Sequence, residues 1–197
     1  MDRKSRSELI GELLVTHTFR NMVEIGLSRG DNVRGIRKYL KERPGPTHLM
    51  HLVYGIDSGE TAKTNGLFRV ELEKLSGWSP FRYLNFTSDE AIQYIKTPMD
   101  LVFVDGSHEP HQIQKDIENY TNIIKHGGIL VGDDYNDLTG KGIKQVVNHV
   151  IGVENINIQL DTRLESGHDN YLWWTYILHS KDSKDGKPYG YWKGFPK

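Results

Sequence analysis

Four short apolar runs in this chain each end in acidic or glycine sequence. They cover residues 22–25, 49–56, 101–104 and 128–131. Amphipathic stretches lie between the runs, and in the stretch 31–43 the apolar side chains recur three and four residues apart. This alternation is typical of β-α units that form a mostly parallel sheet. The pattern therefore restricts the chain to the α/β class.

The same pattern predicts a Rossmann-like, doubly wound and mostly parallel sheet of seven strands, with helices on both faces. Helices are expected at about 31–43 and at 143–151, with one more before the first strand. A further helix should begin at Pro110 and be capped by Gly127. The strands are expected at residues 22–25, 49–56, 81–86, 101–104, 128–131, 156–160 and 172–179.

The length of 197 residues allows one well-buried core and is short for two domains. We expect a single domain over residues 1–180. The remaining residues, 181–197, are polar and rich in glycine and lysine, which indicates a tail of loop or disorder.

Composition narrows the functional class. A formal net charge of -1 disfavours a nucleic-acid partner, because such proteins carry a basic surface. The chain has no cysteine, so any metal must be held by oxygen or imidazole ligands. No apolar run is long enough to span a membrane, and the first residues lack the apolar core of a signal peptide. We therefore expect a cytoplasmic protein without a membrane partner.

The turn after the first strand reads VEIGLSRG, with Gly26 and Gly30 where the backbone can approach a ligand closely. It lacks the full G-x-G-x-x-G spacing of a dinucleotide site. Asp57, at the end of the second strand, is suited to accept hydrogen bonds from a ribose diol, although a plain turn residue explains it equally well.

Three segments together resemble a known family. VEIGLSRG, YGIDSG and the run from LVFVDGSHEP to GGILVGDDY resemble the class I S-adenosylmethionine (SAM) methyltransferases. The last of them is similar to the macrocin and aminocoumarin sugar O-methyltransferase group. The resemblance covers about residues 20–150, is strongest over 101–135, and identifies the predicted domain as a SAM-binding methyltransferase domain.

The resemblance implies a set of binding residues. The glycine-rich turn would meet the amino-acid part of SAM, Asp57 would bind the ribose, and Ser88 would lie near the adenine. Asp105, Asp133 and Asp134 match acidic positions that hold Mg²⁺, or Mn²⁺, in the family. The residues assigned to the cofactor are Glu24, Gly26, Ser28, Gly30, Asp57, Ser88 and Asp105.

Three carboxylates in one cleft repel one another unless a cation or a proton compensates, which agrees with a metal site. A bound metal would also lower the pKa of a substrate hydroxyl. A plain turn remains the alternative for the Asp133-Asp134 pair.

Asp105 and His108 are the candidate catalytic residues, with His108 as general base, because imidazole titrates near neutral pH. A surface role for His108 remains open. Many relatives carry an acid where this chain has Ser107, so proton removal here would pass to His108 or to the metal alone.

These observations predict a metal-assisted O-methyltransferase that acts on a hydroxyl of a sugar-like or phenolic small molecule. An NAD-dependent oxidoreductase and a non-catalytic cofactor-binding module are the alternatives. Relatives often have extra N-terminal helices over the substrate. We therefore expect that the cleft is open here or that a second copy of the chain, in a homo-oligomer, covers it.

Overall fold

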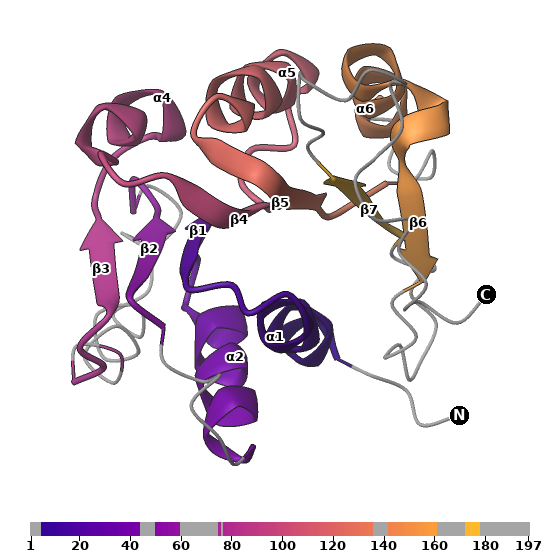
Figure 1. The fold of residues 1–197 in the computed structure, drawn as a ribbon. Coiled ribbons are helices and arrows are strands. Elements are labelled where there is room, and N and C mark those ends of the chain that lie inside the picture. The colour runs from indigo at the N-terminus through magenta and orange to yellow at the C-terminus, as the bar shows by residue number, and fades with distance from the viewer. Residues whose placement is uncertain are drawn as a thin grey trace, which may run out of the picture.

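The fold is built on one central sheet (Figure 1). The computed structural model describes residues 5–43, 50–59, 75, 77–135, 142–160 and 172–177. Strands β3, β2, β1, β4 and β5 pair in this order and are all parallel, and β7 and β6 extend the sheet beyond β5 in antiparallel pairing. The strand bounds are β1 Asn21–Ile25, β2 Leu52–Ile56, β3 Phe81–Leu84, β4 Met99–Val104, β5 Ile124–Gly132, β6 Asn157–Leu160 and β7 Leu172–Ile177.

Strand order reverses beside β1. The chain moves outward from β1 through β2 to β3, and then returns to the other side of β1 with β4. In the ladders, Ile25 pairs with both Ile56 and Val104, so these three strands end at the same level. Open parallel sheets bind ligands at such a reversal, outside the carboxyl ends of the strands.

Helices cover both faces of the sheet. This arrangement, with five neighbouring strands of the sheet in parallel, confirms a Rossmann-like α/β fold. Helices α1 (Arg6–Thr16) and α2 (Asp31–Lys41) lie on one face, and α4 (Ser88–Ala91), α5 (Pro110–Thr121) and α6 (Ile143–Ile151) on the other (Figure 1). Each face has its own buried apolar cluster. Within the described residues, the helices are too short or too polar to cross a bilayer.

The helix that begins at Pro110 ends earlier than the sequence indicated. It stops at Thr121, and Gly127 lies inside β5 with a φ of 75° rather than capping the helix. The reason is that the chain joins the sheet at once: Met99 N–H donates to the Ile123 carbonyl (2.8 Å), and Ile124 pairs with Met99. Ile124 therefore belongs to the strand, although its spacing fits the apolar face of α5.

Helix α4 was missed by the sequence analysis. A capping box that joins Thr87 and Glu90 starts it, and this sequence signal was available. The other predicted elements are confirmed with shifts of a few residues at their ends. Residues 49, 178 and 179 of the predicted strands, and the predicted tail 181–197, lie outside the described residues.

Helices α1 and α2 touch through two glycines. A Cβ atom on Gly11 would lie 2.4 Å from Cδ1 of Tyr39, and one on Gly35 would lie 2.5 Å from Cβ of Ser7. Neither position has room for a methyl group, so the missing side chains set how closely the helices approach. This contact fixes α1, and with it Arg6 at the start of the helix, relative to the sheet.

Substitution of Gly35 by alanine tests this contact. Helix propensity alone would stabilise Gly35→Ala by about 1 kcal/mol. The clash with Ser7 should outweigh this gain, since overpacking costs about 1–3 kcal/mol. We expect a lower free energy of unfolding in urea. In the control, Gly77→Ala, a Cβ would meet no atom within 4 Å, so the change should stay within about 0.5 kcal/mol. A stabilised Gly35→Ala variant would contradict the close packing.

Candidate functional site

An open cleft with a volume of about 660 Å³ lies outside the carboxyl ends of β1, β2 and β4. Its size suits a nucleoside-sized ligand. Five of the seven residues predicted to bind the cofactor line it, whereas Glu24 and Gly30 do not. The lining residues are Arg6, Ile25, Gly26, Ser28, Ile56, Asp57, Ser58, Phe86, Thr87, Ser88, Asp105, Gly106, Ser107 and His108.

Gly26 lets the ends of β1 and β4 come together. Its φ is 85°, and a Cβ atom there would lie 1.9 Å from the carbonyl oxygen of Asp105. No other residue fits this point, so the glycine is required by the backbone of β4 as well as by a ligand. Gly30 has a φ of 73° and is the N-cap of α2, which places its role in the turn rather than on the cleft wall.

Asp57 is held firmly in the cleft. Its carboxylate accepts hydrogen bonds from the backbone N–H of Ser28 (2.7 Å) and of Gly59 (2.8 Å). The Tyr83 hydroxyl donates to the Asp57 carbonyl (2.9 Å). A carboxylate fixed in this way has lone pairs left to accept hydrogen bonds from a diol.

Glu24 lies beneath the cleft and not on its wall. It is buried in β1, and its Oε2 accepts a hydrogen bond from Nδ2 of Asn32 (3.0 Å). Burial raises the pKa of Glu24 to about 7, against the lowering effects of Asn32 and Arg6. The carboxyl group is therefore close to half-protonated near neutral pH.

The Ser88 hydroxyl points into the protein. It donates to Oδ1 of Asp116 (2.6 Å), and Nε2 of Gln112 bonds to both groups, at 3.1 Å to Ser88 and 3.0 Å to Asp116. Asp116 is fully buried, and burial raises the pKa of its carboxyl group. The predicted adenine contact of Ser88 would therefore come from its backbone.

Sequence reasoning missed Asp116. It stands among the apolar residues of α5 at the spacing of their buried face, between Ile113 and Ile117. A carboxylate at a helix position that should be buried was the sequence feature that could have identified it. Its buried position serves to fix Ser88 and the short helix α4.

The aspartates at the ends of β4 and β5 share one arginine. Nη1 of Arg6 donates to Oδ2 of Asp105 and to Oδ2 of Asp133, the latter at 2.7 Å. Burial raises the pKa of Asp105, as do the charges of Asp133, Glu24 and Asp134, while Arg6 lowers it. Arg6 was also missed by the sequence analysis, because the capping box of Ser5 and Glu8 around it predicts the start of a helix and no contact with the distant strand ends.

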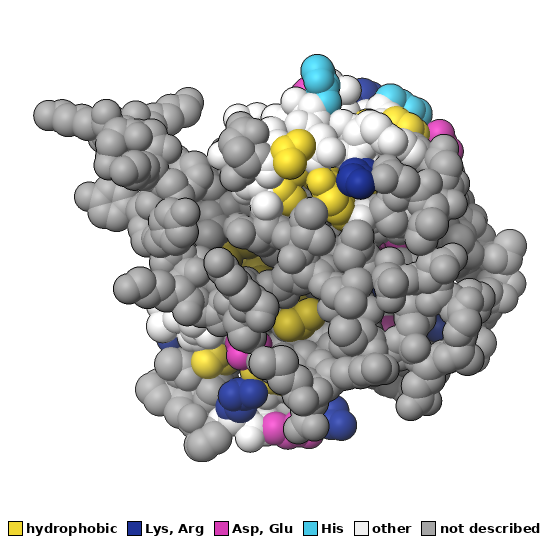
Figure 2. Space-filling view, turned by 90° about the vertical axis from the view of Figure 1, so that its right-hand side faces the viewer, with side chains coloured by type: hydrophobic (Ala, Val, Ile, Leu, Met, Phe, Trp, Pro, Cys, Tyr) yellow, Lys and Arg dark blue, Asp and Glu magenta, His cyan; other side chains and the backbone are white. Residues whose placement is uncertain are grey.

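Three other histidines among the described residues that follow β4 lie at the surface. His111, His126 and His149 are exposed, and Figure 2 shows histidine side chains at the upper end of one face. His168 lies outside the described residues.

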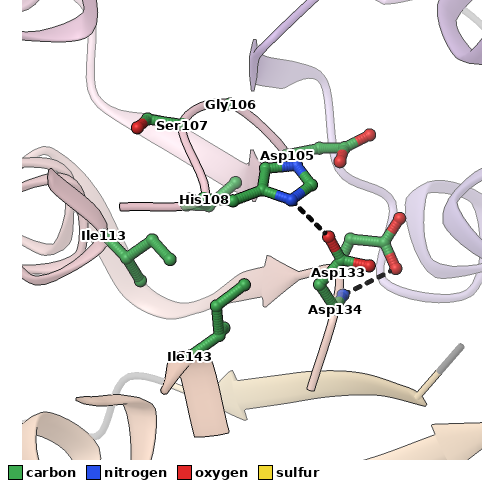
Figure 3. Close-up of a pocket in the computed structure, with 9 residues that line it drawn as sticks. Asp105, Gly106, Ser107, His108, Ile113, Asp133, Asp134 and Ile143 are labelled. Atoms are coloured by element: carbon green, nitrogen blue, oxygen red, sulfur yellow. Dashed lines mark hydrogen bonds and ion pairs between the residues drawn. The ribbon is translucent and has the colours of Figure 1, made fainter. Parts of the chain in front are cut away.

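His108 is different, because it pairs with Asp134 (Figure 3). Nδ1 of His108 lies 3.0 Å from Oδ2 of Asp134, which is almost fully buried. Asp134 has a φ of 56°, an unusual value for a residue with a side chain, and its N–H donates to Oδ1 of Asp133 (2.9 Å). The bend directs the two neighbouring aspartates to different partners.

The three aspartates do not converge on one point. Asp105 and Asp133 meet Arg6, whereas Asp134 meets His108. The cavity beside them has a volume of about 20 Å³, room for about one water molecule. Within the described residues, no three histidine or acidic side chains are placed to hold a metal ion. In this arrangement the residues do not fit a metal held jointly by the three aspartates.

Comparison with known proteins identifies the class of protein to which this chain belongs. The family described as "Methyltransferase domain" matches residues 23–135. No curated protein is similar enough to count as a relative.

Several solved structures share the fold. An rRNA methylase from Streptococcus thermophilus has a TM-score of 0.62 and 16% identity, over 91% of this chain and 100% of the other. An O-methyltransferase from Bacillus cereus in complex with S-adenosylhomocysteine (SAH) has a TM-score of 0.62 and 14% identity, over 87% and 80%. The O-methyltransferase TomG from Streptomyces achromogenes, in complex with SAM, has a TM-score of 0.61 and 14% identity, over 88% and 79%. At these identities the likeness shows the fold alone.

The chain belongs to the methyltransferase domain family, and it is a SAM-dependent methyltransferase. The predicted position of the cofactor, in the cleft at the carboxyl ends of β1, β2 and β4, stays a prediction. The family match also decides between the alternatives raised by the sequence, in favour of a methyltransferase and against an NAD-dependent oxidoreductase or a non-catalytic module.

Asp57 should contribute strongly to cofactor affinity. Asp57→Ala should weaken SAH binding, measured by calorimetry, by about 1.5–3 kcal/mol, because hydrogen bonds to a charged group are lost. Asp100→Ala is a matched control. Asp100 also accepts two backbone N–H groups, from Arg20 and Asn21 (both 2.9 Å), but at the opposite end of the sheet. Equal affinity in the two variants would place the ribose elsewhere.

Glu24 should make stability depend on pH. Between its ordinary pKa of 4.5 and its folded pKa of about 7, the folded chain keeps a proton that the unfolded chain releases. Stability is therefore lost as the pH rises through this window, by about 3 kcal/mol in total. Glu24→Gln should lack this loss, whereas Glu42→Gln, at the exposed end of α2, should keep it. Urea unfolding on either side of the window measures the difference, and identical profiles for wild type and Glu24→Gln would refute the assignment.

Proposed function

We propose that this enzyme transfers the methyl group of SAM to a hydroxyl of a small molecule, of the sugar-like or phenolic kind. The observation that carries the proposal is the His108–Asp134 pair at the edge of the cofactor cleft. A hydroxyl must lose its proton as it is methylated, and a histidine oriented by a buried carboxylate is suited to take that proton.

Asp134 orients the base. Its carboxylate lies 3.0 Å from Nδ1 of His108, where it favours the tautomer with the proton on Nδ1 and leaves Nε2 to remove a proton from the acceptor. The developing imidazolium is then stabilised by the Asp134 carboxylate, as in other His–Asp pairs. His108 lies in the loop between β4 and α5 and lines the cleft, so an acceptor beside Ser107 would be within its reach.

The residues of the cleft fit SAM, which supplies an electrophilic methyl group on a sulfonium. Asp57 would hold the ribose, and the turn at Gly26 allows close approach of the amino-acid part. His108 takes the proton of the acceptor hydroxyl while the oxygen electron pair forms the bond to the methyl carbon. The electron pair of the broken carbon–sulfur bond stays on sulfur, and the products are a methyl ether and neutral SAH.

The charges around the cleft support a small acceptor rather than a nucleic acid. A phosphate backbone needs basic side chains to neutralise it, and Arg6, the one lysine or arginine among the described residues that line the cleft, is already paired with Asp105 and Asp133. The prediction of Mg²⁺ or Mn²⁺ is not used in this mechanism, because Arg6 occupies two of the three expected ligands. A homo-oligomer that covers the cleft and a cytoplasmic location stay predictions.

His108→Ala should lower turnover by roughly 10²- to 10⁴-fold, the range for loss of a positioned base. SAH affinity should hardly change, because His108 acts on the acceptor. His111→Ala, an exposed histidine on α5, is the matched control and should keep full turnover. The measurement is turnover with a panel of hydroxylated sugars and phenols, with pH profiles.

The pH profile separates the base from a merely structural histidine. Loss of the base should remove an ionisation from the acidic limb of the profile. Asp134→Asn should lower turnover but keep that ionisation at a changed position. If the His108→Ala variant keeps both the wild-type turnover and the acidic limb of the pH profile, another group removes the proton.

A further inference from the structure

The start of α1 brings a cation into the acidic end of the sheet. Nη1 of Arg6 bridges Oδ2 of Asp105 and Oδ2 of Asp133, residues 99 and 127 positions away in the sequence. Its guanidinium also lies over the Phe103 ring, 5.7 Å from the centroid. The side chain is 27% exposed and lines the cleft. Two ion pairs and an aromatic contact fix this arginine at one point.

Parallel pairing makes such a cation necessary. β1, β4 and β5 place Glu24, Asp105 and Asp133 at one edge of the sheet, and Asp134 follows directly. Carboxylates this close ionise together only when a positive charge compensates. Arg6 lies against two of them, and its charge also favours the ionised form of Glu24.

Among the described residues, the same geometry leaves no site for a divalent metal held jointly by the three aspartates. Mg²⁺ requires oxygen ligands at about 2.0–2.1 Å in octahedral geometry. One carboxylate oxygen of each of two expected ligands, Oδ2 of Asp105 and Oδ2 of Asp133, faces Nη1 of Arg6. Asp134, the third expected ligand, faces His108 instead. A metal bound by these two oxygens could enter only by displacing the guanidinium.

We propose that Arg6 is the resident cation of this site in place of a divalent metal, so that α1 forms part of the active site. Arg6 is then a positioning residue. It holds Asp105 and Asp133 in their observed places, and it leaves removal of the acceptor proton to His108. This last consequence rests on the proposed function, but the exclusion of metal by Arg6 does not.

Manganese binding tests the proposal without any need for an acceptor. Free Mn²⁺ has a paramagnetic resonance signal that is lost on binding, so the chelator-treated protein can be titrated directly. Wild type should leave Mn²⁺ free, and Arg6→Gln should bind it at least about tenfold more tightly. The double variant Arg6→Gln with Asp133→Asn should lose this binding. Arg43→Gln is the control, because Arg43 lies over Tyr39 at the end of α2, 4.2 Å from its ring centroid.

Two results would overturn the proposal. One is saturable Mn²⁺ binding by wild type that Asp133→Asn abolishes, and this measurement holds whether or not Arg6→Gln folds. The other is an Arg6→Gln variant that binds SAH like wild type but leaves Mn²⁺ free, because Arg6 would then not fill a cation site.

Turnover in EDTA distinguishes the two proposals. Full methylation of a hydroxyl in EDTA supports both. Methylation that requires an added metal refutes the role of Arg6 and leaves the proposed function intact. Absence of any O-methylated product, with wild type leaving Mn²⁺ free, counts against the proposed function alone.

Discussion

Repulsion among the carboxylates at one edge of the sheet is the constraint on which the site depends. Parallel pairing of β1 with β4, and of β4 with β5, places the ends of these strands side by side. Because Glu24, Asp105 and Asp133 occupy these ends, the fold assembles negative charge before any ligand binds. The chain compensates for this negative charge in two ways. Burial raises the pKa of Glu24, so its carboxyl group keeps a proton more readily, and Arg6 forms ion pairs with Asp105 and Asp133.

Asp133 and Asp134 show how one dipeptide can serve two purposes. The left-handed backbone at Asp134 costs roughly 1–3 kcal/mol for a residue with a side chain. In return, Asp133 faces the arginine and Asp134 faces the histidine (Figure 3). An extended backbone at this point would turn the second carboxylate away from its present direction. Aspartates also adopt this backbone in ordinary turns, so it is the two separate side-chain contacts that favour a functional role for the pair.

Much of the fold followed from local sequence patterns. The strand ends at Ile56 and Val104 were predicted because each buried run stops at a charged residue, and the parallel topology then placed Asp57 and Asp105 in one cleft. The boundary at Ile124 was missed because its apolar side chain satisfies both the helical period of α5 and the pairing of β5. Sequence alone cannot separate these two, since the choice depends on pairing with Met99.

The site residues that the sequence did not predict were missed for a different reason. Arg6 bonds to Asp133, and Asp116 bonds to Ser88, in both cases over a long sequence separation. Neither Arg6 nor Asp116 belongs to a motif that indicates a functional residue. An arginine in the first turn of a helix is ordinary as a local feature, and even slightly unfavourable, because the helix dipole is positive there. Only the packing of α1 on α2 brings this arginine to the two aspartates.

That packing connects the stability of the molecule to its chemistry. Gly11 and Gly35 let α1 lie so close to α2 that Arg6 reaches the ends of β4 and β5. A small displacement of α1 would lengthen the contacts to both aspartates at once, because a single nitrogen makes them. The carboxylates would then have to bind a proton or another cation. The spacing between two helices on one face of the sheet thus sets the charge of a site at its edge, and this makes the glycines of the helix interface part of the electrostatics of the acidic strand ends.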